Sequence, residues 1–125
     1  VRSTNPISKY RYACGAAVVL QQSTFIKAPR FWEVGGFNEK NQTCWDGELV
    51  AKLLDAGAKF HHLDEPLGAF RIYAGSITGR GDNNSQYLGD KCRIFRELYD
   101  RNPSIRDICM KFLFTAERKI LSLLK

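Results

Sequence analysis

The sequence predicts an α/β fold with a helical C-terminal extension. An apolar, β-branched stretch near the N-terminal end has the character of a buried strand, and two shorter strand-like stretches follow in the middle of the chain. Apolar residues recur at helical spacing between and after these stretches. The predicted order is one strand, two helices, two short strands and two closing helices, which indicates the α/β class.

The first strand and the first helix are predicted in the N-terminal third. Residues 1–11 are polar and predict an irregular entry. The stretch from Ala13 to Phe25 contains the continuous apolar run Ala16–Leu20, so we expect a buried strand that emerges into polar residues. A short helix over Pro29–Val34 follows, with proline at its first position and Gly35 as its C-terminal stop.

A second helix is predicted from Asp46 to Gly57. Its apolar stripe at helical spacing consists of Leu49, Val50, Leu53 and Leu54. Beyond it, Lys59 to Leu63 and Leu67 to Tyr73 predict two short strands. The segment from Gly75 to Gln86 is rich in Gly, Asn, Asp and Ser, so we expect a mobile loop there.

Two helices are predicted to close the chain. The first covers Tyr87 to Tyr99, and the second follows Asn102-Pro103, is capped by Ser104 and ends at about Leu124. The apolar side of this last helix comprises Ile105, Ile108, Cys109, Phe112, Leu113, Ala116, Ile120, Leu123 and Leu124. We expect this side to pack on the helix's own domain.

The composition fits one domain, or part of one, with an ordinary core. Hydrophobic residues make up 44% of the 125 residues and charged residues 26%, as in a typical globular protein. No apolar run approaches the roughly 18 residues of a membrane span, and nothing resembles a signal peptide. Since the sequence opens with Val1, we expect a piece of a longer protein. The expected location is the cytoplasm, with the inner face of the membrane as the alternative.

The net charge and the spacing of the cysteines limit the classes of function that the sequence allows. The net charge of +6 fits an anionic partner, such as a nucleotide or a membrane surface, without selecting one. No RNA-binding aromatic motif or basic recognition helix is present, so we do not expect nucleic-acid binding. The cysteines Cys14, Cys44, Cys92 and Cys109 lack Cys-x-x-Cys spacing and are typical of reduced cytosolic thiols, and we expect no metal ligands among the residues of this chain.

Asp46 is the main candidate for chemistry. It follows a Gly-Gly turn and a polar loop and lies where the second predicted helix begins, so it either caps free backbone N–H groups or acts as a general base. Glu48 lies two residues further on. Because side chains at i and i+2 point about 200° apart on a helix, Asp46 and Glu48 do not form a metal-binding pair.

Two further groups of polar residues have open interpretations. Gln21, Gln22 and the Ser-Thr pair that follows them are either the solvated end of a strand or hydrogen-bonding groups for a hydroxyl-rich ligand. Arg71 is either a surface cation or a planar, bidentate clamp for an anion.

Four segments, taken together and in order, carry a resemblance. They are Gln21–Phe25, Val34–Glu39, Trp45–Leu49 and Phe70–Ser76, with Gly-Gly-Phe-Asn-Glu and Trp-Asp-Gly-Glu-Leu as the central motifs. The set resembles the second, acceptor-side half of the family-2 glycosyltransferases with the GT-A fold. The resemblance covers about residues 12–80. It implies an acceptor-side part of a GT-A-like layer over residues 1–80, and a mobile loop with a helical extension over residues 81–125.

The resemblance implies an inverting transfer of a sugar from a nucleotide-sugar donor to a hydroxyl of a glycan or lipid-linked acceptor. Asp46 matches the family's general base, which removes the proton of the attacking hydroxyl. Gln21, Gln22, Trp45 and Glu48 are expected near the acceptor, and Arg71 near the donor phosphates.

Mg²⁺ or Mn²⁺, held by an Asp-x-Asp element, supports the diphosphate leaving group in this family. This chain has no Asp-x-Asp and lacks the nucleotide-binding half. We therefore expect the intact enzyme to need the ion, and this part alone to bind no metal and to be inactive.

A non-enzymatic role is the alternative. The closing helix is basic and amphipathic, with Lys111, Arg118, Lys119 and Lys125 available to face anionic groups. Such a helix is typical of an interaction module or of a peripheral membrane contact. Asp107 and Glu117 dilute its charge. The oligomeric state, the sugar and the acceptor leave no signal in the sequence.

Overall fold

The computed structural model of the chain describes residues 7–63, 65–69 and 84–123. In this part of the chain every regular element is a helix. The elements are α1 (Lys9–Ala13), the 3₁₀ turn η1 (Gln21–Ser23), α2 (Ala28–Glu33), α3 (Trp45–Asp55), α5 (Asn84–Tyr99) and α6 (Ile105–Leu123).

The predicted α/β fold, with its GT-A-like layer, is wrong for the described residues, which contain no β-strand and hence no sheet. The predicted strand Ala13–Phe25 begins at the end of α1 and contains η1. Leu20 and Thr24 do have extended backbone torsions, with φ of −95° and −109°. Apolar and β-branched side chains favour extended backbone, but a strand also needs a neighbouring segment with which to exchange hydrogen bonds.

The two later strand predictions are also wrong for those of their residues that the structure describes. Lys59–Leu63 and the described residues 67–69 have irregular backbone. The rest of the Leu67–Tyr73 prediction, and most of the loop predicted from Gly75 to Gln86, lie outside the described residues. Ser85 and Gln86, predicted in that loop, belong to the first turn of α5.

The four helix predictions are confirmed. The predicted helix Pro29–Val34 is α2, with proline in its first turn and Gly35 beyond its end at a φ of +79°. The helix predicted from Asp46 is α3, and Gly57 follows it with a φ of +74°. The two closing helices are α5 and α6, and Ser104 immediately precedes α6 as predicted.

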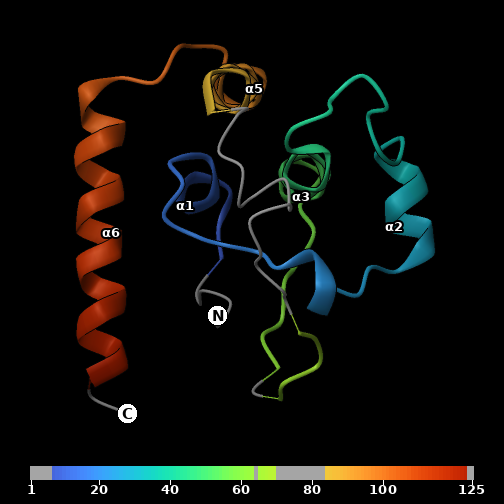
Figure 1. The fold of residues 1–125 in the computed structure, drawn as a ribbon, viewed down its shortest axis with the longest axis horizontal. Helices are drawn as coiled ribbons and strands as arrows, with labels where there is room; N and C mark the ends of the chain where they lie inside the picture. The colour runs from blue at the N-terminus through green and yellow to red at the C-terminus, as the bar shows by residue number, and fades with distance from the viewer. Residues whose placement is uncertain (1–6, 64, 70–83, 124–125) are drawn as a thin grey trace.

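The core lies where α1, α3 and α5 meet, with α2 beside α3 and α6 on the opposite side of the molecule (Figure 1). α3 has the most continuous buried face. The buried apolar residues are Ala16, Ala17, Cys44, Leu49, Val50, Ala51, Leu53, Ile94 and Phe95. Among them, Phe95 of α5 is the largest side chain that is almost fully enclosed. The N-terminal end of α3 is thus held in place by packing against the core and against α5.

α6 is attached to the core by polar and aromatic contacts rather than by an apolar interface. The Tyr10 hydroxyl donates to Asp107 (2.8 Å), and the Tyr10 ring meets Phe114 edge-on at 6.2 Å. Arg11 pairs with Glu117 (2.6 Å), and its guanidinium lies over the Phe114 ring. None of the helices in the described part of the chain combines the length and the apolar character that crossing a bilayer requires.

Candidate functional site

Asp46 lies in the first turn of α3, one residue inside the helix. Cys44 occupies the N-cap position and provides no side-chain cap. The Asp46 carboxylate is half-buried, and its Oδ1 accepts the backbone N–H of Gly47 at 2.8 Å. Among the described residues, the second oxygen, Oδ2, has no hydrogen-bond partner. Asp46 therefore satisfies one N–H group of the helix and, within the described part of the chain, keeps an oxygen with open lone pairs at the positive end of the helix dipole.

An aromatic cluster supports this end of α3. The Trp45 ring packs edge-on against Phe37 with ring centres 4.9 Å apart, and Phe37 packs in turn on Phe31 at 5.1 Å. Gly36 makes this possible, because its φ is +64° and a Cβ there would lie 3.1 Å from the Phe31 ring. Trp45 is thereby held by the Gly-Gly-Phe turn, and it fixes the position of the neighbouring Asp46.

Tyr12 of α1 contacts the same turn of α3 from the core side. Its hydroxyl donates to the carbonyl oxygen of Gly47 at 3.0 Å. Burial raises the pKa of Tyr12 well above its usual range, and the negative charge of Asp46 raises it further. Tyr12 consequently stays neutral and keeps its donor, which locks the backbone that carries Asp46. No sequence pattern had pointed to a role for Tyr12.

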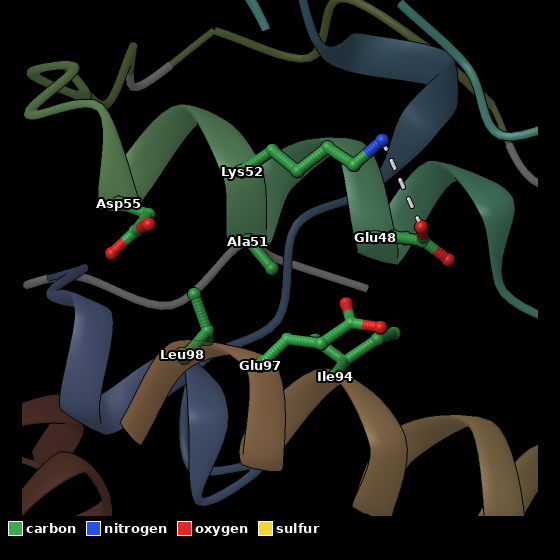
Figure 2. A pocket seen from close by; sticks show the side chains of 7 residues that line it. All are labelled: Glu48, Ala51, Lys52, Asp55, Ile94, Glu97 and Leu98. Carbon is green, nitrogen blue, oxygen red and sulfur yellow. Dashed lines mark ion pairs between the residues drawn. The ribbon is translucent and has the colours of Figure 1, made fainter. Parts of the chain in front are cut away.

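Glu48 has the opposite environment to Asp46. Its side chain is 3% exposed, and both oxygens are used. Oε1 accepts Asn38 Nδ2 (2.8 Å), and Oε2 accepts Asn41 Nδ2 (2.6 Å) and an Arg93 nitrogen (2.5 Å). Lys52 approaches Oε1 at 3.8 Å, the ion pair that Figure 2 marks with a dashed line.

The electrostatics of Glu48 follow from these contacts. Burial by itself would raise the pKa of Glu48, but hydrogen bonds from Arg93, Asn41 and Asn38 outweigh it and lower the pKa to about 2. The same hydrogen bond holds the pKa of Arg93 above its usual range. Glu48 is thus ionised at neutral pH and anchors α3 to the preceding loop and to α5. The expected position of Glu48 near the acceptor stays a prediction, and in the described structure both of its oxygens already accept hydrogen bonds from the protein.

The loop before α3 is fastened at several points. Arg93 of α5 also pairs with Glu97 (2.8 Å), and Thr43 donates to Asp90 (2.5 Å). Asn41, which is 4% exposed, accepts the backbone N–H groups of Thr43 and Cys44. Two asparagines three residues apart thus close the polar loop over the buried Glu48. Sequence reasoning missed Asn38, Asn41 and Arg93 as a group, because only the fold brings α5 against this loop.

Gln21 and Gln22 lie in η1, and both are exposed. Gly68, which is far from Gln22 in the sequence, packs closely against it. A Cβ on Gly68 would lie 2.5 Å from the backbone oxygen of Gln22. Only glycine allows so close an approach of two backbones. The described residues 67–69 therefore pass directly beside Gln22. Arg71 itself lies outside the described residues.

Contacts join two of the three segments that the structure describes. Phe37 with Trp45 and Asn38 with Glu48 join the Gly-Gly-Phe segment to the Trp-Asp-Gly-Glu segment. Gln22 lies beside Gly68, and the fourth segment, Phe70–Ser76, lies outside the described residues. For the described residues, the structure gives no direct contact between Gln21 or Gln22 and Asp46. Of the predicted site residues that the structure describes, Trp45, Asp46 and Glu48 lie together at the start of α3, and Gln21 and Gln22 lie apart from them in η1.

Two hollows lie in the described part of the chain. A cavity of about 70 Å³ lies between α3 and α5, and its lining side chains appear in Figure 2: Glu48, Ala51, Lys52, Asp55, Ile94, Glu97 and Leu98. This volume suits water rather than a sugar, since ligand pockets usually exceed 300 Å³. A larger, shallow hollow between α1 and α6 is lined by Tyr10, Ile105, Arg106, Cys109 and Met110. Asp46 lines neither hollow.

The same residues offer few groups for a metal ion. Over the described ranges, no group of three or more His, Cys, Asp or Glu side chains is placed to hold an ion. Glu48 is committed to Arg93 and the two asparagines, and Asp46 offers a single open oxygen. These residues do not fit the Mg²⁺ or Mn²⁺ that the resemblance implies for the intact enzyme.

Comparison with models of known protein families, with curated proteins and with solved structures gives no match for this chain.

Proposed function

We propose that this chain is the acceptor-side part of an inverting glycosyltransferase related to family 2, in which Asp46 is the general base. Two lines of argument support the proposal. The first is the ordered set of four segments, which follows the family's pattern over about residues 12–80. The second is that contacts of Phe37 with Trp45 and of Asn38 with Glu48 join two of these segments, as parts of a common site would be joined.

The observation that carries the proposal is the state of the Asp46 carboxylate. Its Oδ1 is fixed by the Gly47 N–H, and its Oδ2 has no partner among the described residues. A sugar hydroxyl is a weak nucleophile, and a carboxylate oxygen within hydrogen-bond reach can take its proton as the new C–O bond forms. The hydroxyl oxygen then attacks the anomeric carbon from the side opposite the nucleoside diphosphate, which leaves with its bonding electron pair. The configuration at that carbon is inverted.

The other residues have supporting roles in this proposal. Trp45 and Phe37 hold the first turn of α3, and Tyr12 fixes the carbonyl of Gly47. Glu48 positions the loop through Asn38 and Asn41 rather than contacting the acceptor. Gln21 and Gln22 are exposed amide groups that suit a hydroxyl-rich ligand, and Arg71 suits the donor phosphates. Binding of the nucleotide, and of a divalent ion, is assigned to a part of the protein beyond this chain.

The reaction class can be tested on the protein that contains this chain. Purified protein is incubated with a panel of nucleotide-sugars and hydroxyl acceptors, and release of nucleoside diphosphate is measured with and without acceptor. We expect release that depends on the acceptor, and a product whose anomeric configuration, read by NMR, is opposite to that of the donor. Retention of configuration, or no acceptor-dependent release with any donor in the panel, would contradict the proposal.

A further inference from the structure

α6 presents its polar side to α1. Asp107 accepts hydrogen bonds from Tyr10 and Arg101, and the Phe114 ring meets the Tyr10 ring edge-on. At about 100° per residue, Lys111 lies within about 60° of both Asp107 and Phe114, so it belongs to the same side of the helix. The large apolar residues of α6 are exposed instead. The expectation that the apolar side of this helix packs on its own domain is therefore wrong.

Two lysines from different helices converge on the end of α1. Gly15 follows α1 at a φ of +75°, and a Cβ there would lie 3.3 Å from the Nζ of Lys91 and 3.9 Å from the Nζ of Lys111. Lys91 belongs to α5 and Lys111 to α6, and both helices lie beside α1 (Figure 1). The Lys91 ammonium group also lies 5.3 Å from the centre of the Tyr87 ring, which helps to hold it there. Both ammonium groups thus lie within 4 Å of one point.

The described residues provide no counter-charge for these two groups. Neither Lys91 nor Lys111 forms an ion pair within the part of the chain that the structure describes. The carboxylates on the elements around them are each paired with an arginine. These pairs are Asp90 with Arg93, Asp107 with Arg101 and Glu117 with Arg11. Since two positive charges so close together repel each other, an anion beside both of them would be stabilising.

The end of α1 does not by itself explain why lysines gather there. The C-terminal end of a helix attracts cations, but α1 has only five residues and hence a small dipole. Gly57 follows the longer helix α3 in the same way, with a φ of +74°, and no atom lies within 4 Å of the position of a Cβ on Gly57. The convergence of Lys91 and Lys111 is therefore particular to Gly15.

We propose that Lys91, Lys111 and Gly15 form a binding site for a phosphate group, here called the Gly15 site. A phosphate group carries up to two negative charges, and its oxygens point in tetrahedral directions, so one group can accept hydrogen bonds from both ammonium groups. Lysine binds phosphate as a point charge and needs no planar alignment. Glycine keeps the approach to both nitrogens free, since a Cβ at this position would crowd Lys91. The Gly15 site does not depend on the proposed enzymatic function.

Binding is tested by NMR titration of the isotope-labelled full chain with inorganic phosphate at neutral pH, with the ionic strength held constant by chloride. The amide signal of Gly15 should move along a saturable curve, and the amide signal of Gly57 should not move. Gly57 is the matched reporter because it is also a glycine of positive φ after a helix, but no lysine lies beside it. An unmoved Gly15 signal, or equal movement of both glycines, would overturn the proposal.

The two lysines are tested with variants of equal net charge. Lys91→Gln with Lys111→Gln should weaken phosphate binding at least about tenfold, because two charge-assisted contacts are lost. Lys40→Gln with Lys59→Gln removes the same charge from exposed positions elsewhere and should change binding less than about threefold. Equal losses in both double variants would mean that only net charge matters, and this would overturn the assignment of the site.

The repulsion between the two lysines has its own test. Lys111→Met keeps an unbranched side chain but removes the charge, so in phosphate-free buffer of low salt its thermal unfolding midpoint should lie above that of the control Lys40→Met. Added phosphate should raise the midpoint of the wild type more than that of Lys111→Met. A midpoint of Lys111→Met no higher than that of the control would assign Lys111 to the end of α1 and overturn the proposal.

The source of the phosphate group is distinguished by competition for the Gly15 signal. Adenosine monophosphate represents a soluble phosphate ester, and vesicles of phosphatidylcholine with about 10% phosphatidic acid represent a lipid headgroup. Displacement of inorganic phosphate by either one supports the Gly15 site and identifies the kind of ligand. A site that binds inorganic phosphate and neither of these compounds would hold an adventitious ion only, and this would overturn the proposal.

Discussion

The carboxylates of Asp46 and Glu48, two residues apart in the first turn of α3, have opposite environments. Glu48 is enclosed and uses both oxygens for Asn38, Asn41 and Arg93. Asp46 uses one oxygen for its neighbour's N–H group and keeps the other open within the described structure. Their roughly opposite directions on the helix explain the difference, since one faces α5 and the core and the other does not. The turn thus separates a structural acid from a candidate catalytic one.

Glu48→Gln should lower stability without removing the open carboxylate of Asp46. The substitution leaves Arg93 without its buried counter-charge, so we expect a loss of roughly 2–3 kcal/mol in the free energy of unfolding. Chemical denaturation measures this loss. Glu33→Gln is the control, because Glu33 forms an exposed ion pair with Arg30 and should cost less than about 0.5 kcal/mol.

The lowered pKa of Glu48 predicts that the stability of the fold depends on pH. The pKa of Glu48 is lowered to about 2 in the folded state and returns to about 4.3 on unfolding, so the ionised form stabilises the fold above that value. This contribution should be lost as the pH falls from about 4.3 toward 2. Denaturation midpoints measured across this window should fall more steeply for the wild type than for Glu48→Gln. Parallel pH profiles would contradict the assigned pairing.

Asp107→Ala should loosen α6. Asp107 accepts hydrogen bonds from Tyr10, Arg101 and Ser104, and these partners hold the pKa of Asp107 well below its usual range. We expect a loss of roughly 2–4 kcal/mol and faster proteolysis after Asn102. Glu117→Ala also removes a contact of α6, but an exposed one, and should cost less than about 1 kcal/mol.

The Asp107→Ala substitution should also change the titration of Tyr10, which ultraviolet absorbance measures. The hydrogen bond to Asp107, together with burial, raises the pKa of Tyr10 to about 12. In Asp107→Ala, ultraviolet titration should therefore show one tyrosine whose pKa moves toward about 10. An unchanged phenolate titration would show that the contact between Tyr10 and Asp107 does not form in solution.

The Gly-Gly turn offers a matched pair of substitutions. Both glycines have positive φ, +79° at Gly35 and +64° at Gly36, but only at Gly36 would a Cβ meet another group, the Phe31 ring at 3.1 Å. Gly35→Ala should cost about 1 kcal/mol from backbone strain, and Gly36→Ala about 2–3 kcal/mol because the aromatic cluster must also shift. Thermal unfolding measures both. Equal losses would argue against the packing of Phe31 beneath this turn.

Gly89→Ala should stabilise the protein. Gly89 lies in the interior of α5, its φ is not positive, and a Cβ there would meet no atom within 4 Å. Alanine restricts the unfolded chain and favours the helix, so we expect a gain of about 0.5–1 kcal/mol in denaturation experiments. A loss of stability would indicate that another group covers this position.

The sequence predicted the helices well because their signals are local. The stripe Leu49, Val50, Leu53 of α3 and the glycines that follow α2 and α3 report periodicity and chain termination directly. α1 was missed, since a helix of five residues has no periodicity to read. It depends on a side-chain cap from Ser8 and on contacts of Tyr10 and Tyr12 with residues far along the chain.

The strand predictions failed because a strand-like composition does not ensure that a second segment lies alongside to form a sheet. The run from Ala16 to Leu20 has the composition of a buried strand, and Leu20 adopts extended torsions, but within the described residues no segment forms a ladder with it. For the site, the sequence placed Asp46 correctly in the first turn of a helix. The burial of Glu48 depends on Arg93, 45 residues away, and only the tertiary fold reveals it.

Turnover of Asp46→Asn in the intact protein tests the central claim most directly. Asparagine keeps the size of the side chain and can still accept the Gly47 N–H, but it cannot take a proton. We expect kcat to fall by a factor of about 10²–10⁴, with nucleotide-sugar affinity and the unfolding midpoint nearly unchanged and with Glu39→Gln, an exposed acid of the preceding loop, close to wild type. A kcat of Asp46→Asn within about twofold of wild type would contradict the assignment of Asp46 as the general base.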